Sequence, residues 1–199
     1  MSSASEGPSF ERYVASLPGG LDAYPSAQAK GTLVRSVLEE QPREVLEALP
    51  PALRRWVDDP PLESDWVREA ALCALLHAVT EARGWREHAI LDWARERNRE
   101  LFSGPLYRLL MVVATPEALL RHAGMRWSNF HRGSSLTFQG FSDDGARLGL
   151  VFPVGLFDPL ILRVYGAVFG VALELAHARA PVVALEEAGD GFARYCARW

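Results

Sequence analysis

The sequence LFDPLILRVYGAVFGVALELAHAR, residues 156–179, predicts a helix that is apolar over more than half of its circumference. Asp158 can accept a hydrogen bond from the first backbone amides of that helix. Pro159 loses nothing at the first helical position, because the N–H that it lacks would have no partner there. A helix that is apolar nearly all round needs cover on two sides. The stretch therefore predicts one long, buried helix at the centre of the fold.

Predicted strands lie on both sides of this helix in the sequence. Before it, apolar and polar side chains alternate over residues 134–141 and 148–152, and after it they alternate over residues 182–187 and 192–199. Alternation with a period of two is typical of strands that bury one face. The C-terminal part therefore predicts a β-β-α-β-β unit, whose two hairpins form a four-stranded antiparallel sheet around one long buried helix.

The N-terminal half is predicted to form helices separated by glycine and proline. Residues 1–29 are rich in Ser, Pro, Gly and Ala and are expected to form a flexible arm, followed by a single domain over residues 30–199. In this domain we expect a helical part over 30–126, packed on the β-β-α-β-β part over 127–199. The predicted fold class is therefore α+β. The expected helices of the domain's first part cover residues 31–38, 42–49, 51–57, 65–83, 85–102, 106–113 and 116–122.

The composition is that of a soluble globular protein. Of the 199 residues, 49% are hydrophobic and 23% are charged, and the net charge of −4 leaves no basic footprint for nucleic acid. Two cysteines are too few for a secreted disulfide framework, and the first residues lack the basic start and apolar core of a signal peptide. The longest apolar run, residues 164–173, is about half of a membrane span. We therefore expect a cytoplasmic protein without a membrane anchor or a nucleic-acid partner.

Three short motifs carry a resemblance to a known family: KGTLVR at 30–35, WSNFHRG at 127–133 and YCARW at 195–199. On these motifs, the region 30–199 resembles an uncharacterised paralogous family of myxobacterial proteins of similar length. That family is distantly similar to the superfamily of haem–nitric oxide/oxygen-binding domains, vinyl-reductase-type ligand-binding domains and TRAPP subunits. The resemblance implies an α+β fold and a ligand-binding or interaction role, without a particular activity.

The haem-binding relatives grip the haem propionates with a Tyr-x-Ser-x-Arg run and hold the iron through a histidine on a helix ahead of the sheet. The matching strand here reads GLVFP at 149–153 and lacks that run. His131 lies too close to the first strand to occupy the position of the iron ligand. A haem-based gas sensor is therefore the alternative to a sensor of another small molecule, and no cofactor is expected.

The segment 127–132 brings aromatic rings, a histidine and an arginine beside the predicted sheet. Together with two rings of the central helix, it is predicted to line a pocket for an apolar or aromatic molecule. The alternative is a capped loop in which Trp127 and Phe130 pack inward. The predicted lining consists of Trp127, Phe130, His131, Arg132, Tyr165 and Phe169.

Cys73 and His77 stand four residues apart on a predicted helix, a spacing that can place two ligands on one metal. No second pair accompanies them, so a buried thiol beside a hydrogen-bonded core histidine is the favoured interpretation, and no metal is expected. The chain also lacks a nucleophile elbow, a phosphate loop and a zinc-protease motif. We therefore do not expect an enzyme.

Gly166 and Gly170 stand four residues apart on the central helix, where each costs about 1 kcal/mol relative to alanine. A close neighbour is expected to explain both glycines. It is either the chain's own core, which we favour, or the same helix of a second subunit in a homodimer. The sequence as a whole predicts a non-enzymatic small-molecule-binding or protein-interaction module of the sensor or signalling type.

Overall fold

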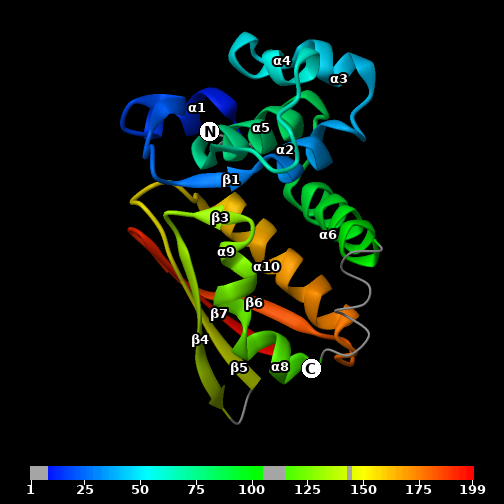
Figure 1. The fold of residues 1–199 in the computed structure, drawn as a ribbon, viewed down its shortest axis with the longest axis vertical. Helices are drawn as coiled ribbons and strands as arrows, with labels where there is room; N and C mark the ends of the chain where they lie inside the picture. Colours follow the sequence, from blue (N-terminus) through cyan, green and yellow to red (C-terminus); the bar gives the residue numbers. More distant parts are fainter. Residues whose placement is uncertain (1–8, 105–114, 143–144) are drawn as a thin grey trace, which may run out of the picture. The chain divides into compact units, whose positions relative to one another are not determined.

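A computed structural model describes residues 9–104, 115–142 and 145–199 (Figure 1). The chain forms two compact units, which divide between Ile90 and Leu91. The division falls inside helix α6 (Glu87–Ser103). The predicted boundary at 126/127, where the hydrophobic period changes, separates two parts of a single domain and not two compact units. Because helix α6 continues across the division between the two units, neither a change of composition nor a linker marks that division in the sequence.

The first unit is built around helix α5 (Glu69–Ala82), in which each residue from Glu69 to Thr80 is buried. Helices α1, α2 and α3 pack on it. The elements that precede α5 are α1 (Phe10–Ser16), a 3-10 turn η1 (Gly20–Asp22), β1 (Gln28–Lys30), α2 (Gly31–Leu38), α3 (Arg43–Ala48), α4 (Pro51–Asp58) and β2 (Trp66–Arg68).

Residues 10–28 differ from the expected flexible arm. Helix α1 packs on α5, and Tyr13 is buried with its ring stacked on His77 at a centroid distance of 4.8 Å. Ser9 caps α1 by accepting a hydrogen bond from the amide of Arg12. The composition hid this contact, because one buried tyrosine holds a segment that is otherwise rich in small and polar residues.

Strands β1 and β2 were not predicted. They pair antiparallel, with Lys30 opposite Trp66 and the Lys30 ammonium 4.3 Å from the centre of the Trp66 ring. Because β2 occupies the first turn of the predicted helix 65–83, α5 begins at Glu69 after an Arg68 cap, four residues later than predicted. Strands of three residues are too short to show an alternating pattern.

The second unit contains the sheet. It follows the rest of α6, and the predicted helix 106–113 lies outside the described residues. Helix α8 begins as predicted, because Thr115 accepts a hydrogen bond from the amide of Ala118. The elements of the unit are α8 (Pro116–Arg121), α9 (Ala123–Ser128), β3 (His131–Arg132), β4 (Ser135–Ser142), β5 (Gly145–Val151), α10 (Pro159–Leu175), β6 (Val182–Gly189) and β7 (Phe192–Arg198).

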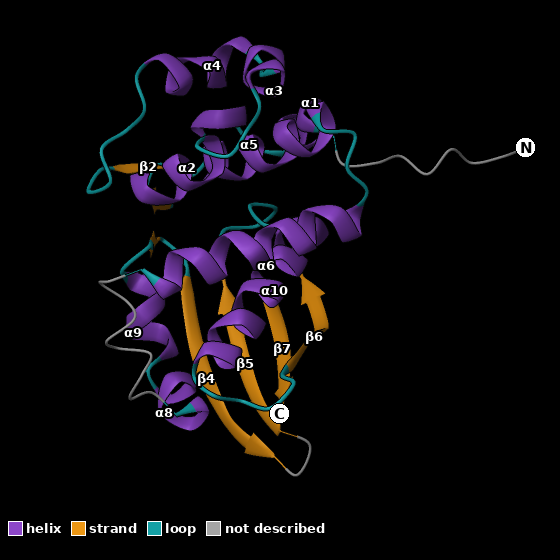
Figure 2. Ribbon diagram, turned by 90° about the vertical axis from the view of Figure 1, so that its right-hand side faces the viewer, coloured by secondary structure: helices purple, strands orange, loops and turns teal. Residues whose placement is uncertain are grey.

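The β-β-α-β-β order and the α+β class are confirmed. The four strands form one antiparallel sheet in the order β4-β5-β7-β6, so the two hairpins join through β5 and β7. Helix α10 lies along β6 and β7, and α9 lies along β4 (Figure 2). The side chains of Ala193, Tyr195 and Ala197 alternate along β7 and are all buried, as the pattern predicted.

Helix α10 begins at the predicted residues. The side chain of Asp158 accepts a hydrogen bond from the amide of Ile161 at 3.0 Å, and Pro159 is the first helical residue. The helix ends at Leu175, four residues before the end of the quoted stretch, and His177 then turns the chain with a φ of 69°. Within the described residues, no helix is both long and apolar enough to cross a bilayer.

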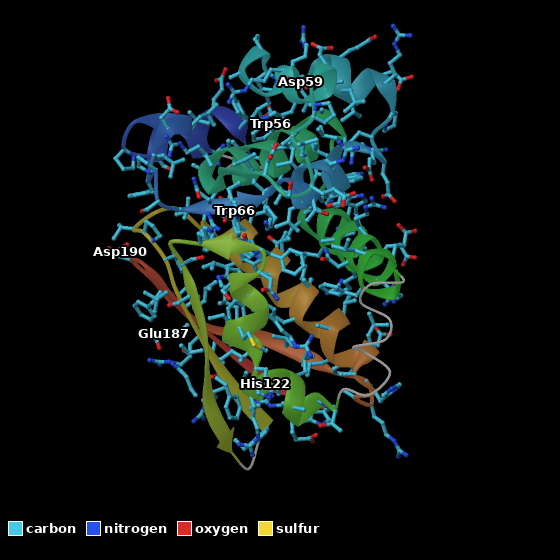
Figure 3. All side chains as sticks on the ribbon, viewed as in Figure 1. Trp56, Asp59, Trp66, His122, Glu187 and Asp190 are labelled. Carbon is cyan, nitrogen blue, oxygen red and sulfur yellow. The ribbon has the colours of Figure 1, made fainter. Side chains whose placement is uncertain are left out.

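The β6–β7 hairpin turns at Asp190 and Gly191, as expected (Figure 3). Gly191 has a φ of 82°, a conformation that favours glycine. Behind the turn, Glu187 and Arg194 form a cross-strand ion pair. Along β6, Ala184 is exposed and lies on the opposite face of the sheet from Val183 and Leu185, because successive side chains of a strand alternate.

Candidate functional site

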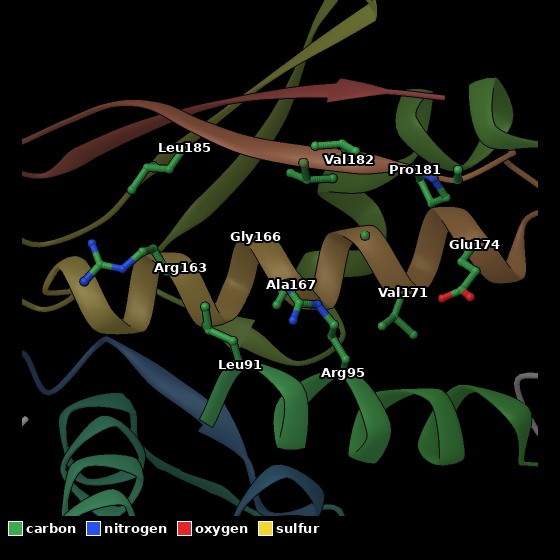
Figure 4. Close-up of a pocket in the computed structure, with 13 residues that line it drawn as sticks. Leu91, Arg95, Arg163, Gly166, Ala167, Val171, Glu174, Pro181, Val182 and Leu185 are labelled. Carbon is green, nitrogen blue, oxygen red and sulfur yellow. The ribbon is translucent and has the colours of Figure 1, made fainter. Parts of the chain in front are cut away.

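A pocket of about 610 Å³ lies between α6, α10 and β6, within the second unit (Figure 4). We call it the α10 pocket. Its floor is a stripe of small residues on α10, its one wall is strand β6, and its other wall is formed by Leu91 and Arg95 of α6. The lining residues are Leu91, Arg95, Arg163, Gly166, Ala167, Gly170, Val171, Glu174, Ala180, Pro181, Val182, Val183 and Leu185.

The two glycines of α10 have different surroundings. A Cβ atom added at Gly166 would lie 3.4 Å from Cε1 of Tyr195, whereas a Cβ atom added at Gly170 would meet nothing within 4 Å. The expectation of a close neighbour therefore holds for Gly166. For Gly170 the favoured internal contact was wrong, because this residue borders the open volume of the α10 pocket. Four-residue spacing puts both glycines near one helix face but does not say what lies above each of them.

Three charged side chains line the pocket: Arg95, Arg163 and Glu174. Glu174 accepts a hydrogen bond of 2.9 Å from Nη2 of Arg99, which ties α10 to α6. This hydrogen bond raises the pKa of the Arg99 guanidinium above its ordinary value. Nη1 of Arg95 donates to Asp92 on the same helix at 2.6 Å. The carboxylate of the pocket is thus already balanced by an arginine that is not among the lining residues.

The structure brings four of the six predicted pocket residues together in a second place, between α9 and α10. The Trp127 ring stacks on His131 at 3.9 Å between centroids, and it meets the rings of Tyr165 at 5.0 Å and Phe169 at 6.1 Å edge-on. Ring contacts continue to Phe157 and Tyr195. We call the set Trp127, His131, Phe157, Tyr165, Phe169 and Tyr195 the aromatic cluster.

The aromatic cluster has the character of a hydrophobic core. Trp127, His131 and Tyr165 are buried, and the indole N–H of Trp127 donates to the hydroxyl of Ser134 at 3.0 Å. The other two predicted residues differ, since Phe130 is half-buried and Arg132 is exposed. Trp127 packs inward as the alternative interpretation of this segment held. That these six residues line a ligand pocket stays a prediction.

Sequence reasoning missed the α10 pocket. The signal was present in the small residues of α10 that follow one another at helical spacing, Gly166, Ala167 and Gly170. We interpreted this spacing as a sign of close packing, because glycine most often permits a close approach of backbone. Only the positions of β6 and α6 decide whether such a stripe is covered or open.

Cys73 and His77 lie in the first unit, whereas the residues that line the α10 pocket belong to the second unit. Both side chains are buried, and the His77 ring stacks on Tyr13. Across the part of the chain that the structure describes, no group of three or more histidine, cysteine or acidic side chains is arranged to hold a metal ion.

Comparison with known proteins supports the fold. No protein-family model and no curated protein sequence matches the chain. Solved structures do. The chain has the fold of H-NOX domains. An H-NOX protein studied for haem distortion superposes with a TM-score of 0.60 at 14% identity, covering 84% of this chain and 92% of that one.

Two further H-NOX structures agree. An oxygen-binding H-NOX domain related to soluble guanylate cyclases has a TM-score of 0.58 at 13% identity and covers 84% of this chain and 89% of its own. A mutant H-NOX protein from K. algicida, in the unliganded Fe(II) form, has a TM-score of 0.55 at 10% identity and covers 85% and 95%. At these identities the likeness establishes the architecture, and it matches the distant similarity that the motifs implied.

The residues of the two sites do not fit a haem. Haem iron is held by histidine, cysteine, methionine or tyrosine, and the described lining of the α10 pocket contains none of these. His131 is the histidine nearest to the sheet in sequence. A haem on this histidine would need room beside a ring that Trp127 and Tyr165 already contact. The chain therefore combines the fold of the H-NOX domains with a different set of side chains.

Proposed function

We propose that this chain is a non-enzymatic small-molecule-binding module of the sensor type and that its ligand occupies the α10 pocket. The observation that carries the proposal is the volume of about 610 Å³ beside Gly170. Ligand sites in proteins have volumes of about 300–1,000 Å³ and are lined mostly by apolar groups with a few polar ones. The α10 pocket lies in this range of volume, and its lining combines ten apolar or small residues with three charged ones.

The lining favours binding over catalysis. A nucleophile needs a neighbouring base to activate it, and the lining residues that the structure describes include no serine, cysteine, threonine, lysine or histidine. The charged groups are two arginines and a glutamate that is already bonded to Arg99. Such groups can orient and hold a ligand.

The walls of the pocket suggest how binding is reported. A ligand in the α10 pocket touches α6 through Leu91 and Arg95, and α6 is the helix within which the two units divide. A shift of α6 on binding therefore acts on the segment that connects the units. The resemblance to H-NOX domains, one of which binds oxygen, agrees with a role in ligand detection.

Filling the pocket tests this proposal. Nile red, a neutral dye that brightens in apolar sites, is expected to bind the wild-type protein and to lose binding in Gly170→Phe. Ala184→Phe is the matched control, because it adds the same ring on the exposed face of the strand that forms a pocket wall. A normally melting Gly170→Phe protein that still binds the dye would overturn the proposal.

The second candidate function is a haem-based gas sensor, which the fold similarity favours and the side chains do not. Absorbance of the purified chain separates the two functions. A stoichiometric Soret band would support the haem sensor against our proposal, whereas a colourless protein that carries a small molecule in native mass spectrometry would support the α10 pocket.

A further inference from the structure

The charged side chains of the α10 pocket bear on the class of ligand, because each of them already interacts with other groups of the chain. Resting on the function proposed above, we infer that the ligand is an uncharged, mainly apolar molecule, such as a medium-chain alcohol or ester. Asp92 and Arg99, which are not among the described lining residues, determine this specificity, because they neutralise the lining charges of Arg95 and Glu174.

The first argument is the pairing of the charges. Nη1 of Arg95 donates to Asp92, three residues earlier on α6, at 2.6 Å. Nη2 of Arg99 donates to Glu174 at 2.9 Å, and Nη1 of the same arginine donates to Glu96 at 2.9 Å. A second ion would have to share or displace these partners, and it would lose its own hydration on entering the pocket. An ion therefore meets no uncompensated charge at Arg95 or at Glu174.

Arg163 does not form a joint site for an anion with Arg95. Figure 4 shows the Arg163 side chain directed away from Arg95. Arg163 also has interactions of its own within the chain. The lining charges and the groups that pair with them comprise three guanidinium groups, those of Arg95, Arg99 and Arg163, and three carboxylates, those of Asp92, Glu96 and Glu174. This set has no excess of either sign.

The second argument is the apolar surface that a ligand would cover. Val182 of β6 lines the pocket and is 60% exposed. On the floor, Gly170 and Val171 of α10 border the same volume. Removing such surface from water is favourable in proportion to its area. An uncharged body gains this free energy in full, whereas an ion must first give up hydration that the paired charges do not replace.

The third argument is the small cost of covering the charged groups themselves. The side chain of Arg95 is 45% exposed and that of Glu174 is 49% exposed. Each keeps its hydrogen-bonded partner when an uncharged ligand covers the apolar stripe beside it. A buried charge that retains a partner of opposite sign costs far less than one that loses both partner and water. The pairs therefore allow a neutral molecule to bind without leaving a charge unsatisfied.

The test compares probes that share one tail and differ in charge. Octanol, octanoate and octylammonium compete with Nile red on the full chain near neutral pH. In the wild type, octanol is expected to displace the dye at a concentration about threefold or more below that of either ion, because neither ion recovers the hydration that it loses. A smaller advantage over either ion would overturn the inference.

Removing the partners tests the roles of Asp92 and Arg99. Asp92→Asn leaves Arg95 without its carboxylate and is expected to raise the affinity for octanoate relative to octanol by about two- to fivefold, the size of an exposed ion pair. The Asp92 side chain is 70% exposed, so this variant is expected to fold. Arg99→Gln leaves Glu174 without its arginine and is expected to raise the relative affinity for octylammonium by a similar factor.

The matched control is Glu100→Gln. Glu100 pairs with Arg97 on the same helix and at the same spacing of three residues as Asp92 with Arg95, and neither Glu100 nor Arg97 is among the described lining residues. This variant is expected to keep the wild-type ratios.

The outcomes separate this inference from the proposed function. An ion that competes as well as octanol in the wild type, or ratios that Asp92→Asn and Arg99→Gln change no more than Glu100→Gln does, overturn the inference while Nile red binding keeps the proposed function. Absence of dye binding to the wild type, or dye binding that Gly170→Phe leaves intact, overturns the proposed function itself.

Discussion

The two sides of helix α10 show how neighbouring residues can build opposite environments. Tyr165 and Phe169 point into the aromatic cluster, where ring contacts fill the space toward α9 and β7. Gly166 and Gly170 stand one residue further along each turn, about 100° around the helix. Gly166 is covered by Tyr195, and Gly170 borders the α10 pocket. A helix that is apolar all round is thus packed on one side and left partly open on another.

The largest loss of stability is expected from a substitution in the aromatic cluster. Trp127→Ala removes a buried ring that contacts His131, Tyr165 and Phe169, and it is expected to lower the free energy of unfolding by about 3–5 kcal/mol in urea denaturation. Trp199→Ala is the control, because that ring is 38% exposed at the end of the sheet, and it is expected to cost less than about 1 kcal/mol. Similar losses in both variants would contradict the core character of the cluster.

The glycine pair gives the next largest effect. Gly166→Leu forces a side chain against Tyr195 and is expected to cost about 1–3 kcal/mol through overpacking. Gly170→Leu enters the pocket and is expected to leave stability unchanged or to raise it by up to about 0.8 kcal/mol, because leucine favours a helix more than glycine does. Thermal and urea unfolding of the two variants decide the order, and the reverse order would show that the pocket is filled.

Sedimentation of the same Gly170→Leu protein tests the predicted homodimer. A dimeric wild type that becomes monomeric in this variant would put Gly170 at a subunit interface. An unchanged sedimentation coefficient, together with loss of Nile red binding, is the result that the α10 pocket predicts.

The Tyr195 ring lies against both sides of α10. Removing its hydroxyl group is expected to have a smaller effect on the free energy of unfolding. Its buried hydroxyl donates to the carbonyl of Leu162 at 2.9 Å, so Tyr195→Phe is expected to cost about 1 kcal/mol near neutral pH. Burial also raises the pKa of Tyr195 above its ordinary value. The folded protein therefore keeps this proton at pH values where the unfolded chain, with a tyrosine pKa of about 10, has lost it.

The sign of the pH dependence follows from this difference. The contribution of Tyr195 is complete below about pH 10 and falls above it, by up to about 1.4 kcal/mol per pH unit. The cost of Tyr195→Phe is therefore expected to shrink between about pH 8 and about pH 11. Urea denaturation of both proteins at the two pH values measures it, and a cost that stays constant would mean that the hydroxyl titrates as it does in water.

The smallest expected effect concerns the ion pair that joins the pocket helices. A double-mutant cycle with Arg99→Gln and Glu174→Gln is expected to give a coupling below about 1 kcal/mol, because both side chains are partly exposed. The coupling should fall as salt is added. The pair Arg43–Glu47, within one exposed helix turn of α3, is the comparison and is expected to couple more weakly. A coupling of several kcal/mol would show that the Arg99–Glu174 pair contributes strongly to holding α6 and α10 together.

Much of the fold followed from local patterns. Asp158 and Pro159 marked the first turn of α10, because capping and a proline at the first position act through nearest neighbours in the chain. Alternation over residues 134–141 and 192–199 found β4 and β7 for the same reason. Strands β1 and β2 were not predicted, since three residues are too few to show an alternating pattern.

The candidate sites were predicted less well than the fold. The motif WSNFHRG correctly drew attention to Trp127 and His131, whose rings the structure joins to Tyr165 and Phe169. The sequence could not say whether these rings surround a space or fill it, because aromatic side chains do both. It also could not show that Arg95 of α6 and Val182 of β6 face the same volume.

By itself, the sequence determined the class of the fold, the order of its strands along the chain and the first turn of its central helix. Periodicity and capping depend on residues that are close together in the chain, so the sequence alone can show them. Only the tertiary structure decided that β5 pairs with β7, that Tyr195 covers Gly166 and that Gly170 is left open. These features depend on which distant segments meet, and the packing of three elements against one helix leaves or removes a cavity without any change in that helix's own pattern.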